Sequence, residues 1–368
     1  PFEDTGASGA SHADIIEKID IGGISLIRAA AKNYKFTSII SSKNQYSAFT
    51  QHYLENNGAI KDNYREQLAS EAFHNTRNYD AAISDYFNAS NISHLRYGEN
   101  PHQKAHFKGD LGEIFNQVSG KALSYNNLLD VDAAVNLIQD ISNEASSSFA
   151  ILKHNNACGC AQRLNVLQAY KAALQADPVS AFGGIFITDK EINLDTAKEI
   201  HKVFYEVCIA PSYSAEALEL LTSKAKRIIL EWSPKESKGD AVRSVLNGVL
   251  VQERDSSYSQ KSDLKVVTNV KPDNNQISDL LFAEKLVKNT KSNAIILVRN
   301  NQLLASGTGQ TSRVDALNQA IAKAEAFSFS LEGAVMASDA FFPFPDCVEI
   351  AGNKGIAAVI QPGGSLKD

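Results

Sequence analysis

The order of apolar and polar positions changes along the chain. From about residue 148 onward, short apolar runs alternate with segments in which apolar residues recur every three or four positions. The first pattern is typical of buried β-strands and the second of amphipathic helices. Strands are predicted at 148–153, 184–188, 227–231 and 247–252, with a hairpin at 294–307. Helices are predicted at about 164–176, 195–206, 276–290 and 312–326.

This alternation predicts an α/β fold in which helices cover a sheet. One strand–loop–helix unit occurs twice, at residues 148–176 and again at 294–326. Repeated units of this kind suggest duplicated halves, although the letters of the two segments show no clean repeat.

The first ninety residues follow a mainly helical pattern instead. Helical patterning runs over residues 13–33, and a long amphipathic helix is predicted at 61–89. Small residues predict a loop at 1–12, and residues 36–41 form a short β-prone run. This region is therefore expected to differ in architecture from the rest of the chain.

A polar, turn-prone run at residues 88–94 separates the two patterns. Runs of this composition favour domain boundaries. We therefore predict two domains, residues 1–90 and residues 91–368. A chain of 368 residues fits two or three domains of ordinary size.

Composition and charge narrow the functional classes. Lys and Arg total 36 against 42 Asp and Glu, giving a formal net charge of −6. A nucleic-acid-binding domain usually carries a basic surplus, so nucleic acid is not an expected partner. No apolar run approaches the roughly 18 residues of a membrane-spanning helix, and no signal peptide is recognisable. The four cysteines form no closely spaced framework, which favours a reducing compartment such as the cytoplasm.

Lys153 and His154 directly follow an apolar strand. Strand ends that open into polar loops are where α/β proteins place reacting groups. This pair supplies a positive charge and a proton acceptor. From spacing alone, a reacting pair and an ordinary strand-end pair are equally good interpretations.

Three other segments carry candidate chemistry. Arg96 begins a polar, proline-containing stretch suited to gripping a phosphate, with an exposed turn as the alternative. Residues 307–313 precede a helix and suit an anion, or simply form a glycine turn with a helix cap. Residues 338–346 hold three phenylalanines, which form either a wall for a flat heterocycle or a buried corner.

Cys158 and Cys160 form a Cys-x-Cys pair without a zinc-deaminase signature, so no metal site is predicted.

Several multi-residue segments occur in one order along the chain: RYGENPHQ, LSYNNLLDVDAA, LKHNNACG, DPVSAFGG, IAPSY, SNA with GTGQTSR, SDAFFPFPD and IQPGGS. In this order they closely resemble the bifunctional purine biosynthesis family. That family couples 5-aminoimidazole-4-carboxamide ribonucleotide (AICAR) transformylase to IMP cyclohydrolase. The resemblance covers nearly all 368 residues.

The resemblance implies an enzyme and a fold. The transformylase moves a formyl group from 10-formyltetrahydrofolate to the 5-amino group of AICAR, and the cyclohydrolase then closes the ring to IMP. Its transformylase domain has a duplicated, cytidine-deaminase-like α/β/α fold without the zinc. This domain is expected to follow the C-terminal part of an α/β, methylglyoxal-synthase-like cyclohydrolase domain.

Three residues match catalytic positions of the family. The resemblance implies that His154 accepts the proton of the 5-amino group and that Lys153 stabilises the developing negative charge on the formyl oxygen. Asn293 matches an asparagine that orients the substrate amide. Nucleotide-binding positions match Arg96, Tyr97, Asn127, Phe182, Gly183, Glu206 and Phe341. Folate-binding positions match Arg313, Val314, Phe344 and Asp346.

Residues 1–90 resemble only the C-terminal part of the cyclohydrolase domain, in which Asp20 and Lys32 match site residues. Against the family pattern, truncation at both ends is expected, and with it no cyclohydrolase activity from this chain alone. The alternative hypothesis is a catalytically incomplete fragment that folds, dimerises and binds nucleotide only. The family also implies a homodimer with shared transformylase sites, and its members can carry a structural potassium ion. The lack of a long apolar run argues against a membrane partner.

Overall fold

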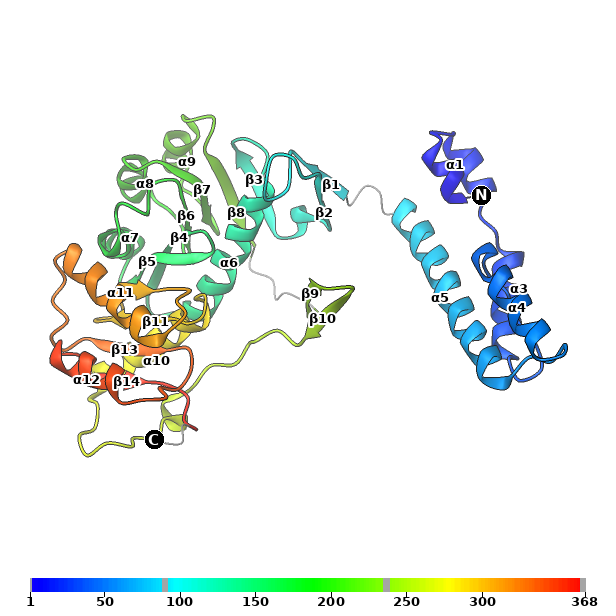
Figure 1. Cartoon of the computed structure of the whole chain (residues 1–368). Coiled ribbons are helices and arrows are strands. Elements are labelled where there is room, and N and C mark those ends of the chain that lie inside the picture. Colours follow the sequence, from blue (N-terminus) through cyan, green and yellow to red (C-terminus); the bar gives the residue numbers. More distant parts are fainter. Residues whose placement is uncertain (1, 88–91, 234–238, 365–368) are drawn as a thin grey trace. The chain divides into compact units, whose positions relative to one another are not determined.

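The computed structural model describes residues 2–87, 92–233 and 239–364. The chain separates into two compact units, residues 1–93 and residues 94–368. Figure 1 labels most of the helices and strands of both units. Part of the boundary run predicted at 88–94, namely residues 88–91, lies outside the described residues.

The first unit is helical over its described residues 2–87. Its helices are α1 (Phe2–Ala7), α2 (His12–Glu17), α3 (Gly22–Lys32), α4 (Tyr46–Glu55) and α5 (Asp62–Phe87). The helix predicted at 61–89 is confirmed as α5. Its small residues Ala69 and Ala72 are buried with Ala31 of α3, because short side chains let two helices approach closely.

Two predictions for this unit were wrong. Residues 1–12 contain α1 rather than a loop, and its Phe2 packs edge-on against Tyr79 and Tyr86 of α5. The small residues of the segment gave no signal of this contact. Residues 36–41 form no strand, because none of the described residues offers them a strand to pair with.

The second unit contains two main sheets. The six-stranded sheet has the order β3-β8-β7-β6-β4-β5, and the four-stranded sheet has the order β12-β11-β13-β14. Its larger strands are β3 (Phe115–Ser119), β4 (Ser147–Lys153), β5 (Asn156–Arg163), β6 (Gly184–Thr188), β7 (Tyr205–Ala210), β8 (Ile228–Trp232), β11 (Ile295–Val298), β12 (Leu303–Gly307), β13 (Val335–Ser338) and β14 (Ala358–Ile360). Two separate pairs are β1 (Ile92–Leu95) with β2 (Ala105–Lys108), and β9 (Ala241–Val245) with β10 (Gly248–Gln252).

Helices flank these sheets, as the alternating pattern predicted. They are α6 (Tyr125–Ile141), α7 (Val166–Ala176), α8 (Leu194–His201), α9 (Ala215–Thr222), α10 (Asn274–Lys288), α11 (Arg313–Ala326) and α12 (Asp346–Asn353). The helix predicted at 195–206 was too long at its C-terminal end. Residues 205–210 are instead the buried strand β7, whose apolar run continues the helical one in the sequence without a break.

Both sheets are built from the same succession of elements. In each half a helix precedes an antiparallel hairpin, a second helix follows, and a third strand pairs antiparallel with the first strand of the hairpin. A further helix then leads to a fourth strand, parallel to the third. The first half runs from α6 to β7 and the second from α10 to β14. The duplication suspected at 148–176 and 294–326 is therefore confirmed, and it extends beyond those segments.

One packing detail repeats with the topology. A Cβ atom on Gly159 of β5 would lie 2.1 Å from the carbonyl oxygen of Ala173 in α7. On Gly307 of β12 it would lie 1.7 Å from the carbonyl oxygen of Ala316 in α11. Both distances are far below van der Waals contact, so only glycine lets the helix pack this closely on its hairpin.

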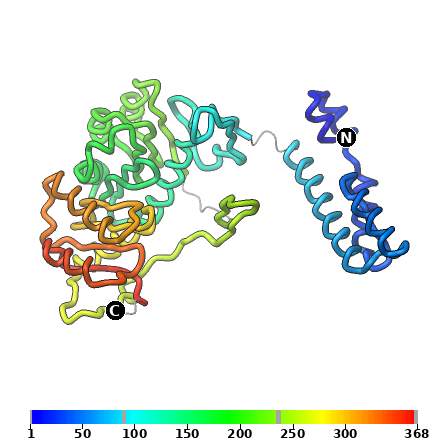
Figure 2. Tube along the Cα trace, in the orientation of Figure 1, coloured from blue at the N-terminus to red at the C-terminus, as the bar shows by residue number. Residues whose placement is uncertain are grey.

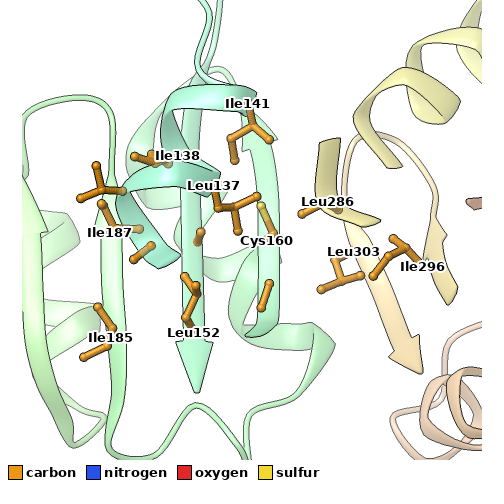
Figure 3. Packing of buried hydrophobic residues seen from close by; sticks show 14 of the residues in the cluster. Leu137, Ile138, Ile141, Leu152, Cys160, Ile185, Ile187, Leu286, Ile296 and Leu303 are labelled. Atoms are coloured by element: carbon orange, nitrogen blue, oxygen red, sulfur yellow. The ribbon is translucent and has the colours of Figure 1, made fainter. Parts of the chain in front are cut away.

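The two halves lie side by side, green and orange in Figure 2, and share one core. Figure 3 shows Leu137 and Ile138 of α6 over the first sheet, and Leu286 near Ile296 in the second half. In addition to this shared cluster, Ala161 of β5 bridges Gln302 beside β12, and Lys323 of α11 pairs with the buried Asp177 after α7 at 2.6 Å. The halves thus form one continuous structure rather than two tethered ones.

The four cysteines are free, and each is buried. Burial raises the pKa of the Cys158 thiol to about 12 and that of Cys347 to about 11. The thiols therefore stay protonated at neutral pH. None of the helices in the described ranges is both long and apolar enough to cross a membrane.

Candidate active site

A two-residue hairpin turn places the predicted lysine and histidine at the end of β4. Lys153 pairs with Asn156, and His154 and Asn155 between them have φ angles of 49° and 65°. Two successive residues with positive φ make the tight turn that suits strand twist. A left-handed conformation costs a residue other than glycine about 1–2 kcal/mol. The turn gains support from α6, because the Asn155 N–H donates to Asp130 Oδ1 at 2.7 Å.

Asp130 also gives the turn a negative neighbour. Burial raises the pKa of the Asp130 carboxyl, while the hydrogen bond from Asn155 and the charges of His154 and Lys153 oppose that rise. Both side chains are therefore within electrostatic reach of one carboxylate. His154 is exposed, and within the described part of the chain its imidazole has no hydrogen-bond partner, so it is accessible to a substrate.

Lys153 meets the loop that precedes β6. Its Nζ donates to the carbonyl oxygen of Phe182 at 2.7 Å, and a Cβ on Gly183 would lie 3.1 Å from Nζ. Gly183 has a φ of 71° and donates its N–H to the carbonyl of Phe204 at 2.7 Å. The Phe182 and Phe204 ring centres are 5.1 Å apart. One predicted catalytic residue and two predicted nucleotide-binding residues therefore lie together.

The second half contributes the loop before β11. Asn156 Oδ1 accepts from the Lys291 backbone N–H at 2.9 Å, which joins the hairpin turn to this loop. The side chain of Asn293 donates from Nδ2 to the Gln310 carbonyl at 3.0 Å, and the two backbones exchange two further hydrogen bonds. The loop that carries Asn293 is thus hydrogen-bonded to the hairpin of Lys153 and His154, although about 140 residues of sequence separate Asn293 from the turn.

Asp339, just after β13, fastens this loop. Its carboxylate accepts hydrogen bonds from the Ser292 hydroxyl and, at 2.9 Å, from the Ala294 N–H. Arg313 Nη1 pairs with it at 2.5 Å and donates from Nε to the Phe341 carbonyl at 3.1 Å. Burial alone would raise the pKa of Asp339, but these hydrogen bonds lower it. Arg313 and Phe341 therefore reach the site, with the guanidinium held by protein groups.

Arg96 and Tyr97 follow β1. The exposed Arg96 donates from Nη2 to Tyr97 Oη at 2.6 Å, and its guanidinium lies 4.6 Å from the ring centre. Asn126 of α6 donates to the Glu99 carbonyl at 3.3 Å, which ties this segment to the helix that supports the turn. Among the described residues, neither Arg96 nor Tyr97 hydrogen-bonds to the hairpin turn itself.

Two other predicted nucleotide contacts have structural partners. Asn127 is buried in a capping box at the start of α6, where its Oδ1 accepts from the Ser124 N–H and hydroxyl. Glu206 of β7 pairs with Lys121 at 2.7 Å in a partly exposed ion pair. Such a partly exposed pair contributes little to stability.

The phenylalanine-rich segment divides between core and surface. Phe342 is buried in the core of the second half, whereas Phe341 and Phe344 are 42% and 57% exposed. Asp346 begins α12, and Val314, the second residue of α11, packs partly against the same core. The segment thus combines both readings of its sequence, a buried corner and an exposed aromatic edge.

Asp20 and Lys32 belong to the first unit, at the two ends of α3. Asp20 Oδ1 accepts from the Gly23 N–H at 2.7 Å, which is a capping role, and Lys32 is an exposed last residue of the helix. About three turns of α3 separate them, and no hydrogen bond or ion pair joins them in the described structure. Any shared chemistry therefore needs other groups.

Sequence reasoning missed several groups that build the site. Asp130 and Asp339 stand within quoted motifs, but neither was singled out, and the roles of Asn156 and Lys291 were also missed. A signal was available once the halves are aligned. Asp130 is the sixth residue of α6, and Asp279 is the sixth residue of α10. Within the described residues, no cluster of three or more His, Cys, Asp or Glu is arranged to hold a metal ion.

Comparisons with known proteins identify the family of this chain. The family model described as AICARFT/IMPCHase bienzyme matches residues 30–323. The bifunctional purine biosynthesis protein PurH of Bacteroides thetaiotaomicron is 56% identical, over 100% of this chain and 74% of its own length. PurH of Persephonella marina and PurH of Aquifex aeolicus are 41% and 42% identical, over all of this chain and 75% of their lengths.

Proposed function

Because this chain belongs to the AICARFT/IMPCHase bienzyme family, we propose that its second unit transfers a formyl group from 10-formyltetrahydrofolate to the 5-amino group of AICAR. One observation supports this most directly. The hydrogen bond from Lys291 N–H to Asn156 Oδ1 brings the Lys153–His154 turn against the Asn293 loop. A proton acceptor, a cation and a side-chain amide then face one substrate.

The chemistry explains why these three groups are needed. The amine of AICAR is conjugated with its ring and carboxamide, so it is a poor nucleophile. In the proposed step, the amine nitrogen attacks the formyl carbon while His154 accepts its proton. Lys153 stabilises the negative charge on the formyl oxygen of the tetrahedral intermediate. The bond to N10 of the folate then breaks, and N10 leaves with the proton that His154 accepted from the amine.

Substrate binding is assigned on the same basis. Asn293 orients the carboxamide of AICAR, and Arg96 binds the phosphate through charge-assisted hydrogen bonds. Supporting nucleotide contacts come from Tyr97, Asn127, Phe182, Gly183, Glu206 and Phe341. The folate is assigned to Arg313, Val314, Phe344 and Asp346. Exposure of Phe341 and Phe344 is compatible with both assignments, because exposed rings can stack on a flat heterocycle.

The first unit is proposed to belong to the cyclohydrolase half, with Asp20 and Lys32 as site residues. A homodimer with shared transformylase sites and a structural potassium ion are further proposals from the family. Sedimentation of the purified chain tests the dimer. Comparing the melting temperature in potassium and sodium buffers tests the ion. A site selective for potassium should raise the melting temperature in the potassium buffer, and equal melting temperatures would argue against the site.

The deciding experiment measures formyl transfer to AICAR, followed by the absorbance of tetrahydrofolate. Turnover supports the proposed function. The second candidate, a chain that binds nucleotide without turnover, predicts AICAR binding by calorimetry together with no product. Absence of both binding and turnover in folded protein would remove the transformylase assignment.

Replacing Arg96 with methionine sharpens the binding assignment. We expect affinity for AICAR to fall about 10- to 100-fold, because a charge-assisted contact contributes about 1.5–3 kcal/mol. Affinity for AICAR lacking its phosphate should not change. The measurement is calorimetric titration with both compounds, and an equal loss for both would place the phosphate elsewhere. Arg243→Met on the exposed strand β9 is the matched control.

A further inference from the structure

A carboxylate of helix α6 supports the hairpin turn of the proposed active site. Asp130 of α6 accepts the Asn155 N–H at 2.7 Å. His154 precedes that residue in the turn and has a φ of 49°, a conformation that side chains other than glycine adopt reluctantly. The direction of the His154 side chain therefore depends on what keeps this turn closed.

The second half contains the same arrangement. Asp279, at the matching position of α10, accepts the N–H groups of Asn300 and Asn301 at 2.8 and 2.6 Å. Those two asparagines form the turn between β11 and β12, with φ angles of 54° and 49°. A helix carboxylate that binds the amides of a left-handed turn is therefore part of the duplicated fold, and not an isolated contact.

The two carboxylates differ in what else surrounds them. Asp279 is 6% exposed and divides its two oxygens between two turn amides. Asp130 accepts one turn amide, and the charged groups that act on it are Lys153 and His154 of the same turn. Asp130 thus accepts one turn amide where Asp279 accepts two, and its charge acts on the two groups assigned to catalysis.

We propose that Asp130 is a positioning residue for formyl transfer, which holds His154 and Lys153 in place through the Asn155 amide and through its charge. This inference rests on the proposed function. Productive geometry must be kept within a fraction of an ångström, and a displacement of about 1 Å can cost roughly 10²-fold in rate. The proposed function assigns Asp130 no contact with the substrate, so its effect is expected to pass through the turn.

The test compares Asp130→Ala with Asp130→Asn. We expect Asp130→Ala to lower kcat about 10- to 100-fold, while the Kd for AICAR measured by calorimetry changes less than about threefold. Asp130→Asn keeps an oxygen for the Asn155 amide but loses the charge, so its kcat should fall less. Asp279→Ala is the matched control, for which we expect a lower melting temperature and an unchanged kcat per folded molecule.

Two results would overturn the proposal. One is a wild-type kcat in Asp130→Ala. The other is that Asp130→Ala and Asp130→Asn lower kcat, AICAR affinity and melting temperature together, each to the same extent in both variants. A purely structural residue would give that result. Amide hydrogen exchange over residues 150–158 supplies a readout that needs no activity. Exchange at the turn must rise in Asp130→Ala, and unchanged exchange contradicts the proposal whether or not the chain transfers formyl groups.

Discussion

The turn in each half of the second unit has the same backbone and a different environment. In the first half, His154 and Asn155 are exposed, and the turn contacts a loop that carries Asn293. In the second half, the carbonyl of Asn300 accepts from Arg163, and that of Asn301 accepts from the Gln162 N–H. The turn of the second half is therefore held to the first half through both of its backbone carbonyls. The turn of the first half meets the second half through the side chain of Asn156, which follows it, and keeps the His154 side chain exposed.

This difference separates what the fold supplies from what the residues supply. Both turns have positive φ angles and a supporting carboxylate, so these features come with the duplicated structure. The reactive side chains are particular to the first half. Its turn carries Lys153 and His154 at the positions that Arg299 and Asn300 occupy in the second half. A shared backbone therefore does not imply a shared role.

The largest effect is expected at the residue that distinguishes the turns. His154→Ala should lower turnover about 10²- to 10⁴-fold, the usual range for a general base, because it removes the imidazole assigned to accept the proton. AICAR binding, measured by calorimetry, should remain. Asn300→Ala at the matching position should leave turnover unchanged. Near-normal steady-state turnover in His154→Ala would remove the residue from catalysis.

A smaller but equal effect is expected where the halves are alike. Gly159→Ala and Gly307→Ala each place a Cβ within 2.1 Å of a helix carbonyl, so each should cost about 1–3 kcal/mol or more of unfolding free energy. Chemical denaturation measures both. Gly352→Ala in α12 has no atom within 4 Å of the new Cβ and should be neutral or slightly stabilising. Very different losses at the two glycines would argue against equivalent packing.

The smallest effect concerns the ion pair that crosses between the halves. Burial alone would raise the pKa of Asp177, but hydrogen bonds from Lys323 and Ser180 lower it. A lowered pKa stabilises the fold above the unfolded pKa of about 4, and this contribution is lost as pH falls through the folded value. Lys323→Met should therefore cost on the order of 1 kcal/mol at pH 7, since Lys323 is one-third exposed, and less near pH 3.

Thermal unfolding at the two pH values measures this difference. Lys354→Met, which removes an exposed pair with Glu325, is the control and should change little at either pH. A loss for Lys323→Met that does not depend on pH would assign its effect to packing rather than to charge.

The sequence predicted elements whose burial leaves a strong pattern. Strand β4, helix α10 and the β11–β12 hairpin were found because their apolar residues are continuous or periodic. Strand β5, with the sequence NACGCAQR, was missed because its small and polar residues carry little strand signal. Its burial comes from the neighbours on both sides, which no local window contains.

The candidate site divides in the same way. Family resemblance found Lys153, His154 and Asn293, since each stands in a recognisable motif. The hydrogen bond between Asn156 and Lys291 spans 135 positions, and the one from Asn155 to Asp130 spans 25. Contacts at such separations depend on the fold. The supporting residues could therefore be identified only from the hydrogen bonds of the folded structure.

The buried cysteines make the relation between the halves accessible to chemical labelling. Cys160 lies in β5 of the first half and Cys347 in α12 of the second, and both are 1% exposed or less. An alkylating reagent reaches a protonated, buried thiol only when the surrounding structure opens. The labelling rates of Cys160 and Cys347 therefore report whether the duplicated halves open together or one at a time. No cysteine has to be introduced by mutation.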